Sequence, residues 1–422
     1  MPSTPSPQDS ADRLSLLYQL SQTFTSSLDL DEVLRRVMDE VITATHAERG
    51  FVMLRDQDQK LHFSAARGMD RQTIDDPQFQ ISRSVVERVA EDGNPVITSD
   101  AQSDSRFNMR QSIMILGLRS ILCVPLIVKA RVTGVIYVDN RLQAGIFTQP
   151  DLDLLNAIAA SAAIAIENAR LYQVAVEKGR LEKELQMAAR VQASLMPKTL
   201  PQLPDWDFAA LWKPAREVAG DYYDIIIEQS GNLGLVIGDV TDKGMPAALF
   251  MAFTRSVIRA TMAQFASPAE GITLANRLIS NDSADNMFVT LFYGRLDLKS
   301  SRLTYVNAGH NPPIFYHSGN QSIRYLTRTG MLIGIGLDDT TYQQESVSFD
   351  RGDFLVLYTD GITEATNPEL EEFGSQRLES VISAHVAVDS QSLLVAIGKA
   401  LDEFTGGVVP SDDVTILVAR KT

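Results

Sequence analysis

The chain is poor in cysteine and lacks long uncharged apolar runs. Its 422 residues include a single cysteine, Cys123. One thiol excludes an intramolecular disulfide framework and fits a reducing, cytoplasmic setting. No stretch of about 18 apolar residues is free of charge, so no transmembrane helix and no membrane partner are expected. Residues 1–11 lack the basic start and apolar core of a secretory signal, and their Pro-rich polar character predicts a disordered leader.

Positive charge is also scarce. The chain has 38 Lys and Arg residues against 53 Asp and Glu residues, which gives a formal net charge of −15. Such a chain repels polyanions, so we do not expect nucleic acid as a partner. The hydrophobic content of 45% is that of a globular protein, and the length predicts more than one domain.

Helix and strand signals alternate over residues 12–172. Asp29, with Glu32 three residues later, predicts a capped helix. Short β-type runs follow at 50–54, 61–65, 121–128 and 134–138, with 129–131 as a hairpin tip. Thr148 then precedes a long helical pattern and is the predicted N-cap. Cys123 falls within one of the apolar runs, which predicts a buried structural thiol.

The segments 48–55, 119–127, 134–139 and 147–155 resemble a GAF sensory domain. The resemblance covers about the first 170 residues and implies an antiparallel sheet with helices that binds a small-molecule ligand. Leu152 replaces the Glu of the GAF domains that bind cyclic nucleotides, which argues against that ligand. The identity of the ligand stays open.

Residues 173–196 are predicted to form a coiled-coil linker helix. Apolar side chains step by three and four, with two polar interruptions, along Leu171, Val174, Lys178, Leu181, Leu185, Ala188, Gln192 and Leu195. This seam predicts a homodimer, and a helix packed on its own domain is the alternative. Pro197 ends the helix and opens a further domain at 197–422.

Acidic residues border short apolar runs in the second half of the chain. Asp239 and Asp360 each follow such a run, Asp412 and Asp413 precede another, and Asp221 follows a glycine. Each acid alone is more simply a turn or surface residue. Together they predict carboxylates at one rim of a sheet, where they repel each other unless a cation lies between them. Oxygen ligands select the hard cations Mg²⁺ and Mn²⁺.

The motifs at 214–224, 238–249, 307–313, 358–364 and 412–415 resemble the SpoIIE-type branch of the PPM metal-dependent Ser/Thr protein phosphatases. They occur in family order across the whole second half. The resemblance implies two packed sheets flanked by helices, so the whole chain is predicted to be α+β.

The resemblance also implies two divalent ions, Mn²⁺ or Mg²⁺, and a role for each acid. Asp239 matches the carboxylate that bridges the ions, and the backbone carbonyl of Val240 matches a ligand of the second ion. Asp360 and Asp412 match the acids that complete the shell of the first ion. Asp221 matches an acid that holds the second ion directly or through water.

Arg216 completes the predicted catalytic set with Asp239 and Asp360. It has the spacing of the phosphate-binding Arg of the wider family, and an ordinary surface position is the alternative. Thr241 stands where the wider family often has a His that protonates the leaving group, so that proton comes from water, from Lys243 or from elsewhere.

These patterns predict a GAF-regulated phosphatase. The resemblance implies that it removes phosphate from serine or threonine of a small protein, such as an anti-sigma-factor antagonist. An inactive scaffold that binds the same partners is the alternative. A sensor kinase is disfavoured because the chain has no phosphoacceptor His box and no Gly-rich nucleotide loop. His310, in a tight turn beside two prolines, is predicted to be structural.

Overall fold

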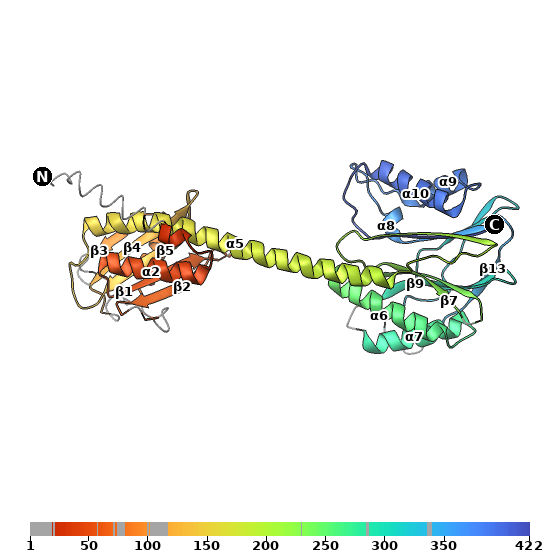
Figure 1. The fold of residues 1–422 in the computed structure, drawn as a ribbon, viewed down its shortest axis with the longest axis horizontal. Coiled ribbons are helices and arrows are strands. Elements are labelled where there is room, and N and C mark those ends of the chain that lie inside the picture. The colour runs from red at the N-terminus through yellow and green to blue at the C-terminus, as the bar shows by residue number, and fades with distance from the viewer. Residues whose placement is uncertain are drawn as a thin grey trace. The chain divides into compact units, whose positions relative to one another are not determined.

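The computed structural model describes residues 19, 22–56, 58–70, 72–73, 81–98, 101, 117–228, 230–283, 287–335 and 340–422. The chain divides into two compact units, Met1–Leu181 and Glu182–Thr422. Both units mix helices with antiparallel sheets, which confirms the predicted α+β class (Figure 1). The predicted leader, 1–11, lies outside the described residues.

The first unit contains one five-stranded antiparallel sheet of order β2-β1-β5-β4-β3. The strands are β1 (Arg49–Arg55), β2 (Leu61–Gly68), β3 (Val96–Thr98), β4 (Ser120–Val128) and β5 (Arg131–Asn140). The predicted hairpin tip is confirmed as a two-residue turn, in which Lys129 and Ala130 have φ of 49° and 62°. A turn with two positive φ values matches the twist of the strands that it joins.

Helices cover both faces of this sheet. They are α2 (Leu30–Thr45), α3 (Arg83–Asp92) and the first part of α5 (Gln149–Leu195). The predicted cap of α2 is confirmed, because the Asp29 side chain accepts a 2.8 Å hydrogen bond from the Glu32 amide. Alternate strand residues point to opposite faces, so α2 and α5 pack with Leu122 while α3 packs with Cys123. Cys123 is fully buried, as predicted, and burial raises the pKa of its thiol.

Helix α5 is one continuous helix of 47 residues. It starts where predicted, because the amide and hydroxyl of Thr148 both donate to Asp151 Oδ2, at 2.8 and 2.6 Å. Among the described helices, α5 alone is long and apolar enough to cross a membrane. Half of its most apolar 18-residue window is buried inside the protein, as in the core helix of a globular domain, so this is weak evidence for a membrane span.

The second unit contains two five-stranded antiparallel sheets of order β13-β10-β9-β8-β7 and β12-β11-β14-β15-β6. The first sheet comprises β7 (Tyr222–Ile227), β8 (Leu233–Val240), β9 (Val289–Asp297), β10 (Arg302–Ala308) and β13 (Glu345–Ser348). The second comprises β6 (Trp206–Lys213), β11 (Ile314–His317), β12 (Ser322–Tyr325), β14 (Phe354–Tyr358) and β15 (Val414–Lys421).

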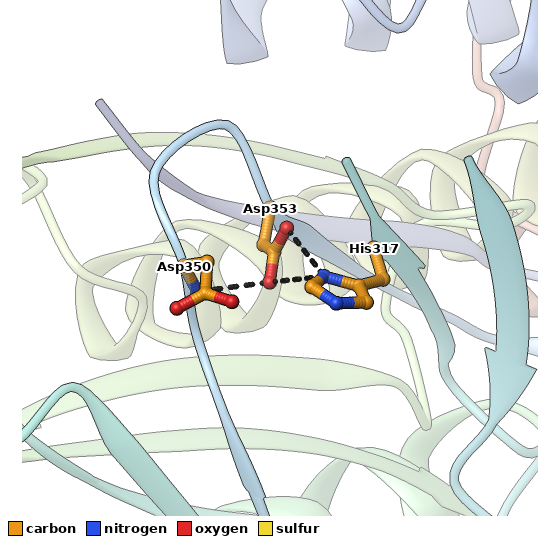
Figure 2. Close-up of side chains that lie close together, drawn as sticks. All are labelled: His317, Asp350 and Asp353. Carbon is orange, nitrogen blue, oxygen red and sulfur yellow. Dashed lines mark hydrogen bonds and ion pairs between the residues drawn. The ribbon is translucent and has the colours of Figure 1, made fainter. Parts of the chain in front are cut away.

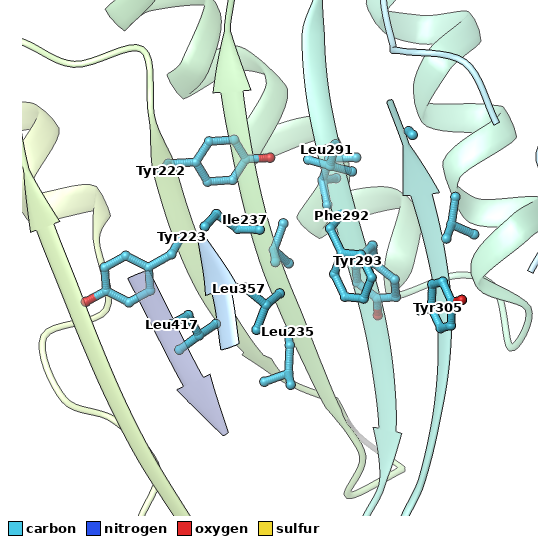
Figure 3. Close-up of a cluster of buried hydrophobic side chains, with 14 of the residues drawn as sticks. Tyr222, Tyr223, Leu235, Ile237, Leu291, Phe292, Tyr293, Tyr305, Leu357 and Leu417 are labelled. Atoms are coloured by element: carbon cyan, nitrogen blue, oxygen red, sulfur yellow. The ribbon is translucent and has the colours of Figure 1, made fainter. Parts of the chain in front are cut away.

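The two sheets pack face to face, and Figure 3 shows the core between them, with Leu235 and Ile237 of β8 beside Leu357 of β14 and Leu417 of β15. Helices α6 (Met245–Met262) and α7 (Pro268–Asp282) lie on one side of the sandwich (Figure 1). Helices α9 (Gly374–Ala384) and α10 (Ser390–Thr405) lie on the other side, and α8 (Asp360–Thr363) is a single turn. The prediction of two sheets flanked by helices is confirmed.

The C-terminal end of α5 packs on the second unit. Gln192 is 4% exposed, its Nε2 donates to the Ala219 carbonyl at 2.6 Å, and its Oε1 accepts from the Ala219 amide at 2.9 Å. Leu195 is half-buried against the core between the sheets. Gln192 and Leu195 therefore belong to this fold and not to the predicted seam, because their partners lie in the same unit. The exposed positions Leu171 and Leu181 leave the rest of the seam a prediction.

Candidate active site

Two of the predicted acids come from neighbouring strands of the first sheet. Strands β7 and β8 run antiparallel, with Tyr222 opposite Gly238. Asp221, directly before β7, therefore faces Asp239 near the end of β8. Asp221 is 1% exposed and accepts a 2.8 Å hydrogen bond from the Thr415 hydroxyl of the other sheet.

The second sheet supplies the remaining acids. Strands β14 and β15 pair with Tyr358 opposite Ile416. Asp360, just after β14, and Asp412, just before β15, therefore lie at the same sheet end. The negative charges of Asp360 and Asp412 both raise the pKa of Asp239. The structure therefore brings the ends of four strands together around one group of carboxylates.

We define the acid cluster as Asp221, Asp239, Asp360 and Asp412. Burial and repulsion between like charges both raise carboxyl pKa values in this cluster. Desolvation, followed by repulsion from Asp360, raises the pKa of Asp239 to about 7. Desolvation and then Asp239 raise the pKa of Asp221 well above its ordinary value. In the described chain, the one ion pair to the cluster joins Lys243 Nζ to Asp412 Oδ2 at 2.8 Å. Such an unbalanced set of oxygen donors fits hard divalent cations.

Two glycines make the close approach of these segments possible. A Cβ placed on Gly220 would lie 3.0 Å from the carbonyl oxygen of Val240, the predicted backbone ligand. A Cβ on Gly361 would lie 2.0 Å from the carbonyl oxygen of Asp413, closer than any real contact. Only glycine can therefore follow Asp360 in this arrangement.

Asp413 is a site residue that the sequence reasoning missed. Its Oδ1 accepts from the Ala215 amide at 2.7 Å, and its Oδ2 accepts from the Gly220 amide at 2.8 Å. These bonds hold the segment that leads into Asp221. The resemblance assigned Asp412 to the metal site and gave Asp413 no role, and the fold adds that Asp413 anchors the loop.

The residues considered for phosphate binding and for protonation of the leaving group have different surroundings in the structure. Arg216 is exposed, and among the described residues it makes no hydrogen bond or ion pair, so the structure does not join it to the acid cluster. Lys243 Nζ donates to the Ser411 carbonyl at 2.6 Å besides pairing with Asp412. The Thr241 hydroxyl donates to the Phe288 carbonyl at 3.0 Å and accepts from the Phe288 amide at 3.1 Å, which ties it to the backbone.

His310 behaves as the structural residue that its turn predicts. It is 1% exposed, and its Nδ1 lies 2.8 Å from the Thr290 hydroxyl. Gly309 before it has φ of 77°, a left-handed value. Desolvation lowers the pKa of His310 to about 4, so the ring is neutral near pH 7 and has no extra proton to donate.

The described residues contain one group of three acid or His side chains whose ligand atoms all lie within 4.8 Å of one another, and it lies elsewhere, at His317, Asp350 and Asp353 (Figure 2). Asp353 is fully buried and accepts from the Ser318 amide at 2.7 Å, the Asp350 amide at 2.9 Å and the Ser318 hydroxyl at 2.9 Å. His317 Nδ1 lies 3.0 Å from both Asp353 oxygens, and this contact raises the pKa of His317. Because these hydrogen bonds occupy both carboxylate oxygens of Asp353, the group joins the turn after β11 to the turn before β14 and needs no metal ion.

Comparison with known families agrees with this geometry. Residues 229–422 match the family described as Stage II sporulation protein E (SpoIIE), and residues 27–167 match the GAF domain. Residues 27–167 are therefore a GAF domain, and residues 229–422 are a SpoIIE-type PP2C phosphatase domain.

Relatives and solved structures are similar over part of the chain. Protein IcfG of Synechocystis sp. is 32% identical over 273 residues, which are 58% of this chain and 43% of IcfG. The phosphoserine phosphatase RsbU of Bacillus subtilis is 29% identical over 243 residues, which are 57% of this chain and 71% of RsbU. The SiaA-PP2C domain of Pseudomonas aeruginosa superposes with a TM-score of 0.51 at 21% identity, over 59% of this chain and 99% of that domain. This last similarity shows the fold alone.

Proposed function

We propose that the protein is a metal-dependent protein serine/threonine phosphatase whose activity is regulated by its GAF domain. The observation that carries the proposal is the acid cluster, in which buried Asp221 and three half-buried carboxylates from both sheets repel each other and one lysine provides the nearby positive charge. The similarity to RsbU, which is named a phosphoserine phosphatase, supports the same chemistry.

The residues present fit two divalent ions, Mn²⁺ or Mg²⁺, which when bound supply an activated water and neutralise phosphoryl charge. Asp239 would bridge the ions, with Asp360 and Asp412 on one ion. Asp221 and the Val240 carbonyl would serve the other. The donors are all oxygens, and four come from carboxylates whose repulsion the ions would relieve.

Lys243 is the residue best placed to contact the substrate phosphate. It lies beside Asp412, and its charge also acts on Asp360. Thr241 is bound to the backbone and His310 is buried and neutral, so neither offers a free proton. A phosphate held at the cluster would accept hydrogen bonds from the Lys243 ammonium group, and the same group can protonate the leaving oxygen.

The substrate proposed is a small phosphoprotein of the anti-sigma-factor antagonist type. The proposed assembly is a homodimer through the exposed seam side chains Leu171, Val174 and Leu181, which are 57%, 60% and 49% exposed. A small molecule that binds the GAF domain would set the activity. Light scattering on wild type and on Leu181→Asp tests the assembly, and a monomeric wild type would contradict it.

The deciding experiment is hydrolysis of para-nitrophenyl phosphate and of a phosphoserine peptide with and without Mn²⁺. The proposal requires Mn²⁺-dependent release of phosphate from both. Lys243→Met should reduce kcat/KM while the protein still binds Mn²⁺ in a calorimetric titration. If wild type binds Mn²⁺ and releases no phosphate from either substrate, the protein is an inactive scaffold and the enzyme proposal fails.

A further inference from the structure

A cavity of about 850 Å³ lies beside the acid cluster, between α10, strand β6 and the segment 408–411. Apolar side chains form most of its wall. They come from all three elements and from the start of β15, and include Leu211, Leu394, Val395, Leu401, Val409 and Val414. A space of this size is within the range of ligand pockets.

Two residues that line the cavity are chain neighbours of acids in the cluster. Gly361, which lines it, directly follows Asp360. Ser411, which also lines it, directly precedes Asp412, and its carbonyl accepts the Lys243 hydrogen bond. The cavity therefore begins one residue along the chain from Asp360 and from Asp412.

The chemistry of the cavity suits an uncharged apolar group. Val395 and Val409 are 57% and 79% exposed, although apolar residues that line a concave surface gain by being covered. The charges at the rim balance within pairs, because Lys213 lies 3.8 Å from Asp402 and Lys399 lies 3.6 Å from Glu403. No surplus of either sign is left among these four side chains to recognise a second phosphate or a cation.

A helical glycine keeps the space open. Gly398 of α10 lines the cavity, and a Cβ built on it would meet no atom within 4 Å. Its backbone has ordinary helical geometry, so the missing side chain is not required by a turn. A larger residue here would project into the cavity without disturbing the backbone.

We propose that this cavity binds an apolar side chain next to the phosphorylated residue of the substrate protein, and so selects among phosphoproteins. The inference rests on the proposed phosphatase function and deepens it. The choice of occupant rests on Gly361 and Ser411, which line the cavity and are the chain neighbours of Asp360 and Asp412. A phosphate ester too small to reach past the cluster gains nothing from the cavity.

The test uses the full chain, Mn²⁺ and three substrates. Two phosphoserine peptides differ only in the residues that flank the phosphoserine, which are leucine in one and asparagine in the other. Para-nitrophenyl phosphate is the third. Burial of one leucine side chain should raise kcat/KM of wild type by about tenfold for the leucine peptide. Val395→Asp and Gly398→Leu should each abolish this preference and leave para-nitrophenyl phosphate turnover unchanged.

Leu278→Asp is the matched control, since Leu278 is an exposed apolar residue, 41% exposed, on α7 across the sandwich. It should keep the leucine preference. Equal rates of wild type on the two peptides would overturn the inference, and so would a preference that survives in both cavity variants. Loss of all turnover in wild type would instead contradict the phosphatase proposal, so the two failures are distinguishable.

Discussion

A strand in each unit carries an aspartate next to its last residue, and the two aspartates, one buried and one half-buried, have opposite surroundings. Asp139 is the penultimate residue of β5, and Asp239 is the penultimate residue of β8. Asp139 faces Arg49 on the neighbouring strand, with Nε–Oδ1 and Nη2–Oδ2 distances of 2.8 and 2.6 Å. Asp239 faces further carboxylates. Burial raises the pKa of both, to about 6 for Asp139, where Arg49 opposes the rise, and to about 7 for Asp239.

The difference shows that position alone does not give a strand-end acid its role. A buried carboxylate with its own guanidinium partner forms a closed structural pair. A half-buried carboxylate among others of the same sign is destabilised in its charged form unless an external cation is supplied. The two aspartates should therefore respond in opposite ways to the same substitution.

The largest effect is expected for Asp139→Asn. The change leaves the Arg49 charge buried without its counterion, so the free energy of unfolding of the first unit should fall by about 3 kcal/mol or more. Urea denaturation measures it. Arg88→Gln is the control, because Arg88 and Asp92 form an exposed pair in which both side chains are 53% exposed. An Asp139→Asn protein as stable as wild type would remove the contrast between the two aspartates.

Asp239→Asn should leave the metal-free protein at least as stable as wild type, since the substitution removes a repelled charge. It should also lower Mn²⁺-dependent kcat by about 100-fold or more, because a ligand of both ions is lost. Thermal melts with and without Mn²⁺ report the first effect, and a para-nitrophenyl phosphate assay the second. Near-normal turnover would contradict the role of Asp239.

The pH dependence of the metal-free protein sharpens the contrast further. The folded-state pKa of Asp239, about 7, lies above that of an unfolded aspartate, so the folded state holds the proton more strongly. Its contribution to stability is therefore full below about pH 4 and is lost as the pH rises towards about 7. Melting temperatures across this range should fall less steeply for Asp239→Asn than for wild type. Saturating Mn²⁺ should flatten the wild-type slope, and equal slopes would contradict the pKa shift.

The smallest effect is expected for Gln192→Ala. The substitution leaves the buried Ala219 amide and carbonyl without partners, at a cost of about 1–2 kcal/mol. Since Ala219 and Gly220 lead into Asp221, the affinity for Mn²⁺ should fall as well. Gln186→Ala, at an exposed site on the same helix, is the control. A titration with Mn²⁺ that is unchanged in Gln192→Ala would show that the helix end does not position the acid.

Local patterns predicted much of this molecule, and distant partners account for what they missed. The strands, the cap at Asp29 and the acids at strand ends depend on neighbouring residues, so the sequence was sufficient for them. Asp139 also follows an apolar run, yet its partner Arg49 lies 90 residues away. Asp413 binds Gly220 across 193 residues, and Gln192 binds Ala219 across 27. No spacing rule in a single sequence reports such contacts.

The position of β15 has a consequence for biosynthesis. This strand lies between β14 and β6 in its sheet, although it comes last of the strands in chain order. Asp412 and Asp413 directly precede it, and they bring the fourth acid of the cluster and the anchor of the loop before Asp221. A growing chain on the ribosome can form the first sheet without them. The acid cluster is complete only after Asp412 and the strand that follows it have been made, so the site forms later than the first sheet.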